Sequence, residues 1–241
     1  MSNKTSLQTN NTTISTNNTE LADILETINS LPEAGGGDTL EIARSIIDKT
    51  ITSYSDDKLT EIGTYMFYNC SKFTELNAPN VTSIGGYAFQ GSKITTMYFP
   101  KLETVVANAF RNAKSIISLD LPTCTKLDNA SVYSCTALTS INIPKVETLV
   151  RACMTSCTSL EYIDLPVCTN IGTQAFNKCT ALKTIILRSE TMCILDGTDA
   201  FSGCSALESV YVRDELVESY KSDSVWNTYA DKIKPISELV E

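Results

Sequence analysis

The chain has 241 residues and a net charge of −9, from 19 Lys and Arg against 28 Asp and Glu. This acidic balance argues against nucleic acid or an anionic membrane surface as a partner. The absence of His excludes Ser-His-Asp and Cys-His nucleophiles and His-ligated metals. No apolar run approaches the roughly 18 residues of a membrane span, and the N-terminus lacks the apolar core of a signal peptide. We therefore expect no membrane insertion and either a cytoplasmic chain or release by cell lysis.

Residues 1–37 form a separate N-terminal arm, rich in Asn, Thr and Ser and ending in three glycines. Apolar residues recur at heptad spacing, so one hypothesis is a coiled coil that joins three chains through residues 1–34. The alternative is a tail followed by a single amphipathic helix over residues 20–30. The candidate oligomerisation residues are Leu7, Ile14, Leu21, Ile24, Ile28 and Leu31.

Residues 38–58 are predicted to cap the domain that follows. Asp38 is placed to N-cap a helix with Glu41 three residues on, and Ile46 and Ile47 would lie on its apolar face. A first strand is then expected over residues 51–54.

A repeat of about 22 residues occupies residues 59–213. Five prolines mark it, with intervals of 21, 22, 22 and 22 residues: Pro79, Pro100, Pro122, Pro144 and Pro166. Before each proline, apolar and polar residues alternate, as in Tyr162-Ile163-Asp164-Leu165, which is typical of a short half-buried strand. The segment Ala-Phe-x-x-Cys/Ala-x-x-Leu has a period of three, which suits a turn of helix or 3₁₀ helix. The sequence thus predicts a leucine-rich-repeat solenoid of one strand and one helical turn per coil.

The repeats resemble the BspA-like, or treponemal-type, leucine-rich repeat family. The copies that carry the resemblance are "LTEIGTYMFYNCSKFTELNAPN", "VTSIGGYAFQGSKITTMYFP" and "TNIGTQAFNKCTALKTIIL". This chain departs from the family pattern at Arg188, which replaces a proline, and at Val132 and Met154, which replace an aromatic residue. The resemblance implies a non-catalytic surface adhesin that binds host proteins, with a helical cap over residues 214–241.

Five of the nine cysteines fall at one position of the repeat, where other copies have Ser92 and Ala113. A position that accepts Ser and Ala wants a small buried side chain, so we expect free thiols. Metal binding and disulfides are the alternatives, suggested by Cys153-x-x-x-Cys157, but no second pair lies at zinc spacing. The five are Cys70, Cys135, Cys157, Cys179 and Cys204.

The C-terminal segment places apolar residues from Leu216 to Ile233 at helical spacing, and Trp226 is predicted to anchor this cap rather than to stack on a ligand.

Exposed strand side chains form the candidate ligand-binding face, because successive coils place equivalent residues side by side. Carboxylates, amides and aromatics together are typical of a contact surface for protein or glycan. The separation of Asp120 and Asp164, two coils apart, is also near that of inverting glycosidases, but a carboxylate on an open strand face is usually only solvated. The candidate residues are Tyr98, Asp120, Asn142, Tyr162, Asp164, Ile186 and Tyr211.

The arm sequence "TNNTELADILETINSLPEA" resembles the leader of structural proteins encoded by phages of gut Firmicutes. The main hypothesis is therefore a phage virion protein, assembled in the bacterial cytoplasm and released by lysis, that contacts other virion proteins through its arm. Its solenoid would recognise a host cell-surface protein or glycan. The alternative is a BspA-like adhesin on the bacterial surface or outside the cell. No enzymatic activity and no cofactor are expected. A third possibility is an intracellular scaffold.

Overall fold

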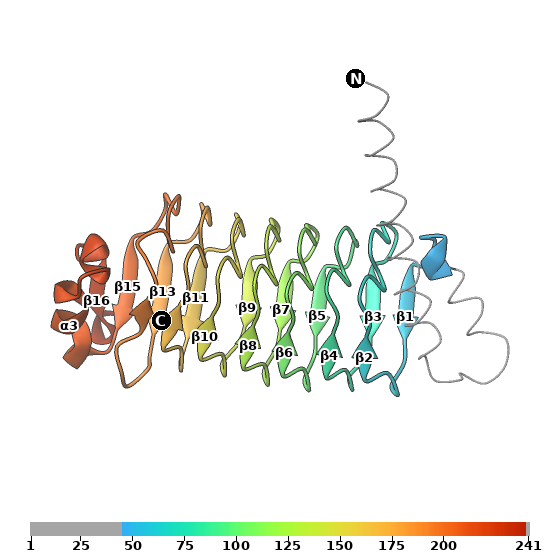
Figure 1. Ribbon diagram of the computed structural model, residues 1–241, viewed down its shortest axis with the longest axis horizontal. Helices are drawn as coiled ribbons and strands as arrows, with labels where there is room; N and C mark the ends of the chain where they lie inside the picture. The colour runs from blue at the N-terminus through green and yellow to red at the C-terminus, as the bar shows by residue number, and fades with distance from the viewer. Residues whose placement is uncertain (1–44, 240–241) are drawn as a thin grey trace, which may run out of the picture.

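The computed structural model describes residues 45–239, which form an elongated solenoid of parallel strands (Figure 1). The arm, all six of its heptad residues and the first part of the predicted N-terminal cap, residues 38–44, lie outside the described residues. Residues 45–47 are helical; Ile46 is buried as predicted, whereas Ile47 is 38% exposed. The first strand begins at Ser53 rather than at residue 51.

Each coil contributes two strands, not the one that the sequence predicted. The first series lies along one side of the solenoid and consists of β1 (Ser53–Ser55), β3 (Glu75–Asn77), β5 (Thr96–Tyr98), β7 (Ser118–Asp120), β9 (Ser140–Asn142), β11 (Tyr162–Leu165), β13 (Thr184–Leu187), β15 (Ser209–Val212) and β16 (Ile233–Pro235). The second series is a continuous seven-stranded sheet of β2 (Glu61–Ile62), β4 (Ser83–Ile84), β6 (Thr104–Val105), β8 (Lys126–Leu127), β10 (Thr148–Leu149), β12 (Asn170–Ile171) and β14 (Ile194–Leu195). Its members are two residues long, too short to show alternation in the sequence.

The repeated prolines stand at turns that join the two series. In the turn after β3, the Val81 N–H donates to the carbonyl of Ala78, which places Pro79 at the second position of a β-turn. The same bond recurs from Leu102 to Phe99 around Pro100. Proline suits this position because its ring fixes φ near the value that the turn requires. We call this side of the solenoid the proline edge.

The opposite side is a ladder of turns, and the predicted helical or 3₁₀ turn is wrong there. Residues with positive φ recur twice in each coil, as at Tyr65 (60°) and Asn69 (54°), and a left-handed residue interrupts a right-handed helix. N–H groups alternate between the same turn and the next coil: Phe67 donates to Ala88, and Cys70 donates back to Phe67. We call this side the turn side. It consists of residues 64–72, 86–93, 107–115, 129–137, 151–159 and 173–181, each beginning two residues after a second-series strand.

The core is a continuous apolar column inside the coils. Phe89 is fully buried and stacks between Phe67 and Phe110, with ring centroids 5.6 and 5.3 Å away. Val132 and Met154 continue this column as buried residues where the aromatic is missing. The replacements therefore change the packing inside the coil without breaking the solenoid.

The C-terminal cap combines short helices with a strand. It contains η1 (Asp214–Leu216), α3 (Val217–Ser222), η2 (Trp226–Tyr229), β16 and η3 (Ile236–Glu238). The helix predicted up to Ile233 is wrong at this residue, because Ile233 lies in β16 and pairs with Val210 of β15. Trp226 anchors the cap as predicted, since it is fully buried and its Nε1–H donates to the Cys193 carbonyl at 2.7 Å.

The Tyr220 hydroxyl accepts the Cys193 N–H at 2.7 Å, so the cap satisfies both backbone groups of that residue. Between residues 45 and 239, no helix has the length and apolarity needed to cross a bilayer.

Candidate functional site

The candidate strand face is the outward side of the first series, visible along the solenoid in Figure 1. Parallel pairing is in register, so Tyr98, Asp120 and Asn142 lie opposite one another on β5, β7 and β9. Asp164, Ile186 and Tyr211 do the same on β11, β13 and β15. The structure therefore brings the predicted residues into one row, except for Tyr162, which begins β11 and lies in the neighbouring row.

Two tyrosines stand out from this face. Tyr98 is 59% exposed and Tyr162 is 55% exposed, well above the half-buried Tyr211. They are three coils apart, about 14 Å at the usual strand spacing. Large aromatic side chains left in water on a flat surface are typical anchors of protein interfaces.

Between the tyrosines, Asn142 Nδ2 donates to Asp120 Oδ1 at 2.7 Å. Asp164 is held differently, because Arg188 Nε donates to both of its carboxylate oxygens, at 2.9 and 3.1 Å. Each carboxylate thus has a fixed partner. Asp120 and Asp164 are therefore arranged for directional hydrogen bonding to a ligand. They are not placed as an acid and a base around an enclosed cavity.

Ile186 was expected on the exposed face and is instead buried, with only 5% exposure. It is an outward position by alternation, but its neighbours in register are Asp164, clamped by Arg188, and Tyr211. Tyr211 in turn lies 5.9 Å from Lys234 Nζ, which hydrogen-bonds Ser209 at 2.7 Å. The C-terminal end of the strand face is therefore closed by its own side chains.

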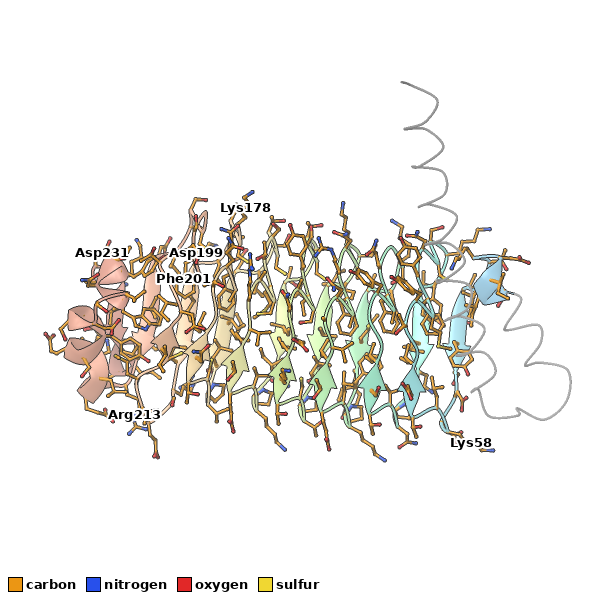
Figure 2. The ribbon with its side chains drawn as sticks, viewed as in Figure 1. Lys58, Lys178, Asp199, Phe201, Arg213 and Asp231 are labelled. Atoms are coloured by element: carbon orange, nitrogen blue, oxygen red, sulfur yellow. The ribbon has the colours of Figure 1, made fainter. Side chains whose placement is uncertain are left out.

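A hollow of about 390 Å³ at this end was missed by the sequence analysis. Arg188 and Arg213 both follow strands paired in register, and Figure 2 shows Arg213 at the edge opposite Lys178. Arg213 Nε is 2.6 Å from Glu215 Oε1. Ser237 lowers the pKa of the Asp214 carboxyl by hydrogen bonds from its side chain and from its N–H. The signal available in the sequence was Arg188 at a proline position with a second arginine one coil later. The lining residues are Arg188, Arg213, Asp214, Glu215, Ile236 and Ser237.

The repeated cysteines are free thiols, four of them buried and Cys204 half-buried. Four of them donate to a backbone carbonyl of the preceding coil, as Cys135 does to Phe110 at 3.1 Å and Cys179 to Met154 at 3.1 Å, whereas Cys70 reaches Ile46 of the N-terminal helical turn. No disulfide joins any of the nine cysteines among residues 45–239.

Burial raises the pKa of the Cys135 thiol to about 12 and that of Cys70 to about 11. These thiols are therefore structural and unreactive rather than nucleophilic. Within residues 45–239, no cluster of three Cys, Asp or Glu side chains is arranged to hold a metal ion.

The comparison with known families decides the classification. The family model for the BspA type leucine rich repeat region matches residues 49–150 and 103–230, which together cover most of the chain. The chain belongs to the BspA-type leucine-rich repeat family. The repeat-based prediction of family and fold is thereby confirmed. A search among curated proteins finds no match to this BspA-type chain.

One solved structure supports the same fold, and two others are similar at lower TM-scores. A leucine-rich repeat protein from Bacteroides ovatus is 22% identical and superposes with a TM-score of 0.53, over 78% of this chain and 55% of its own. A leucine rich cell surface protein from Faecalibacterium prausnitzii is 17% identical, with a TM-score of 0.48 over 78% of this chain and 65% of its own. The pneumococcal vaccine antigen PcpA is 19% identical, with a TM-score of 0.46 over 79% and 42% of the two chains. The BspA-type chain thus spans about half the length of the Bacteroides protein.

Proposed function

We propose that this chain is a non-catalytic binding module of the surface-adhesin type, which contacts a host protein through the strand face between β5 and β11. The exposure of Tyr98 and Tyr162 on either side of the fixed Asp120–Asn142 pair carries the proposal. Membership of the BspA-type family supports it, since the resemblance implies adhesins that bind host proteins. The expected phage virion role has no support from the comparisons, so the surface adhesin, first held as the alternative, is preferred.

The chemistry of the face favours a protein partner. Small hydroxyl side chains begin the strands between the two tyrosines, namely Thr96, Ser118 and Ser140, so the surface there is flat and polar. Adaptable protein-binding surfaces typically combine exposed aromatic residues with small polar residues.

Bead adhesion tests this proposal. Beads coated with the full chain are incubated with an epithelial monolayer, before and after mild protease treatment of the cells. The double variant Tyr98→Ser/Tyr162→Ser is compared with Ile194→Ser, which removes a 57% exposed apolar side chain from the second series. We expect adhesion to be lost in the double variant and on protease-treated cells, and to persist in Ile194→Ser. Adhesion that is absent in the wild type, or unchanged in the double variant, would overturn the proposal.

A further inference from the structure

The turn side differs in charge from the rest of this acidic chain. Its six segments contain six basic residues and no Asp or Glu, although the whole chain carries −9. We call these residues the basic ridge: Lys72, Lys93, Arg111, Lys114, Arg151 and Lys178. The acid-free stretch ends in the next coil at Asp199, which Figure 2 shows on the same edge as Lys178, toward the C-terminal end.

The ridge charges are available to an external ligand. Five of the six side chains are exposed and Arg111 is half-buried. None of them forms an ion pair with a carboxylate of residues 45–239. The acidic residue nearest in the chain, Asp128, precedes its turn segment and pairs with Lys126 at 3.5 Å. Figure 2 shows the labelled Lys178 extending outward from this edge.

The solenoid sets the spacing of the ridge. Its residues extend from Lys72 in the first copy to Lys178 in the sixth, five coil steps or about 24 Å. A row of cations of this length fits an extended polyanion better than a single small anion. Neutral hydrogen-bond donors also lie on the turn side, including Asn69 and Asn112 beside the charges and Ser134 on the one turn segment without a charge.

We propose that the turn side is a docking surface for an extended anionic polysaccharide, one that carries carboxylate or sulfate groups. The ridge supplies the complementary charge, and the hydroxyl edges of tyrosines on the same side supply further donors.

The aromatic residues of the turn side favour a polysaccharide over a single-stranded nucleic acid, because base stacking needs free ring faces. Tyr65 and Tyr87 stack on each other, 5.2 Å apart and 8° from parallel. Tyr68 meets Tyr65 edge-on at 5.3 Å, and the Arg111 guanidinium covers Tyr133 at 4.2 Å. These contacts occupy ring faces that a nucleobase would need.

A membrane surface fits the turn side less well. Peripheral binding combines basic residues with exposed apolar side chains that enter the lipid. The exposed large apolar residues among 45–239 lie outside the six turn segments, as at Ile117 and Val167.

The test uses the full chain and a size-defined heparin oligosaccharide, with affinity measured by titration calorimetry at 50 and 150 mM NaCl. The ridge variant is Lys93→Gln/Lys114→Gln/Lys178→Gln. The matched control is Lys58→Gln/Lys101→Gln/Lys145→Gln, three exposed lysines of the proline edge whose loss changes net charge equally. Circular dichroism melting verifies that both variants fold.

We expect the ridge variant to lose affinity on the order of 10- to 100-fold and to lose part of the salt dependence, while the control keeps both. Equal losses in the two variants would overturn the proposal. So would heparin binding no tighter than neutral dextran. Tighter binding of oligo-dT or of phosphatidylserine vesicles would assign the ridge to a nucleic acid or a membrane instead.

Discussion

The turn side and the proline edge lie on opposite sides of one solenoid, and both carry lysines on several coils. On the proline edge the cations alternate with carboxylates, as where Lys101 is followed by Glu103 and Lys145 by Glu147. On the turn side no carboxylate accompanies them. A net charge of −9 therefore argues against polyanions only on average, because a repeat can concentrate one sign of charge on one side.

The turn side also differs from the strands in what supports it: an aromatic stack, left-handed residues and a column of thiols. Each of these features can be removed separately.

The largest effect is expected from the aromatic stack. Phe89→Ala leaves a cavity between Phe67 and Phe110 and should lower the free energy of unfolding by about 3–5 kcal/mol in urea titrations. Tyr98→Ala on the strand face, 59% exposed, should change it by less than about 0.5 kcal/mol. Similar losses in the two variants would show that the stack does not support the turn side.

Alkaline pH should weaken the thiol column. The folded pKa of Cys135 is raised to about 12 from 9.0, so the folded state retains a proton that the unfolded chain loses. The stability from this protonation is complete below about pH 9 and is lost as pH rises toward 12, at about 1.4 kcal/mol per pH unit for one thiol.

Urea titrations at pH 8, 9 and 10 measure this difference between wild type and Cys135→Ala, which copies the natural Ala113. The stability advantage of wild type over the variant should shrink above pH 9. A constant advantage would mean that Cys135 is not protected by burial.

Replacing Ser92, the serine in the cysteine position of the second copy, by Cys should stabilise the fold. Its hydroxyl is buried without a hydrogen-bond partner, whereas four of the equivalent thiols reach a carbonyl of the preceding coil, as at Cys135 and Cys157. Ser92→Cys has the longer C–S bond and should raise the free energy of unfolding by about 1 kcal/mol. Ser92→Ala separates the relief of the buried hydroxyl from the gain of a thiol bond. A destabilised Ser92→Cys would contradict this account of the column.

The smallest effect compares one substitution on the two sides. Ser134 has φ of 58°, a conformation that Gly adopts without steric cost. Ser134→Gly should therefore raise the free energy of unfolding by about 0.5–1 kcal/mol. Ser118 lies in β7, where Gly loses more conformational freedom on folding, so Ser118→Gly should destabilise by a similar amount. Thermal melts that shift in the same direction would refute the left-handed assignment.

The regular features of the fold could be predicted because they repeat. Proline spacing fixed the coil length, and alternation at Tyr162–Leu165 located β11. The second strands could not be found, because two residues such as Ile171 and its neighbour show no period. The left-handed positions left a signal that was not used: Asn69, Gly91 and Asn112 occupy one position of successive copies, and these residue types favour positive φ.

Side-chain neighbours limited the prediction of the strand face. Alternation placed Tyr98 and Ile186 on the same surface, but exposure depends on what stands on the next coil. Tyr98 adjoins the smaller Asp120, whereas Ile186 lies between the clamped Asp164 and Tyr211. The burial of Ile186 depends on side chains of the neighbouring coils. The alternation pattern within one repeat carries no information about them.

Lysine footprinting tests most directly the claim that charge is segregated between the two edges. The full chain is acetylated briefly with and without the heparin oligosaccharide, and the modified lysines are quantified by mass spectrometry. Our account predicts protection of Lys72, Lys93, Lys114 and Lys178, with Lys58, Lys101 and Lys145 of the same molecules modified as before. Equal protection on both edges, or protection of the proline edge alone, would contradict it.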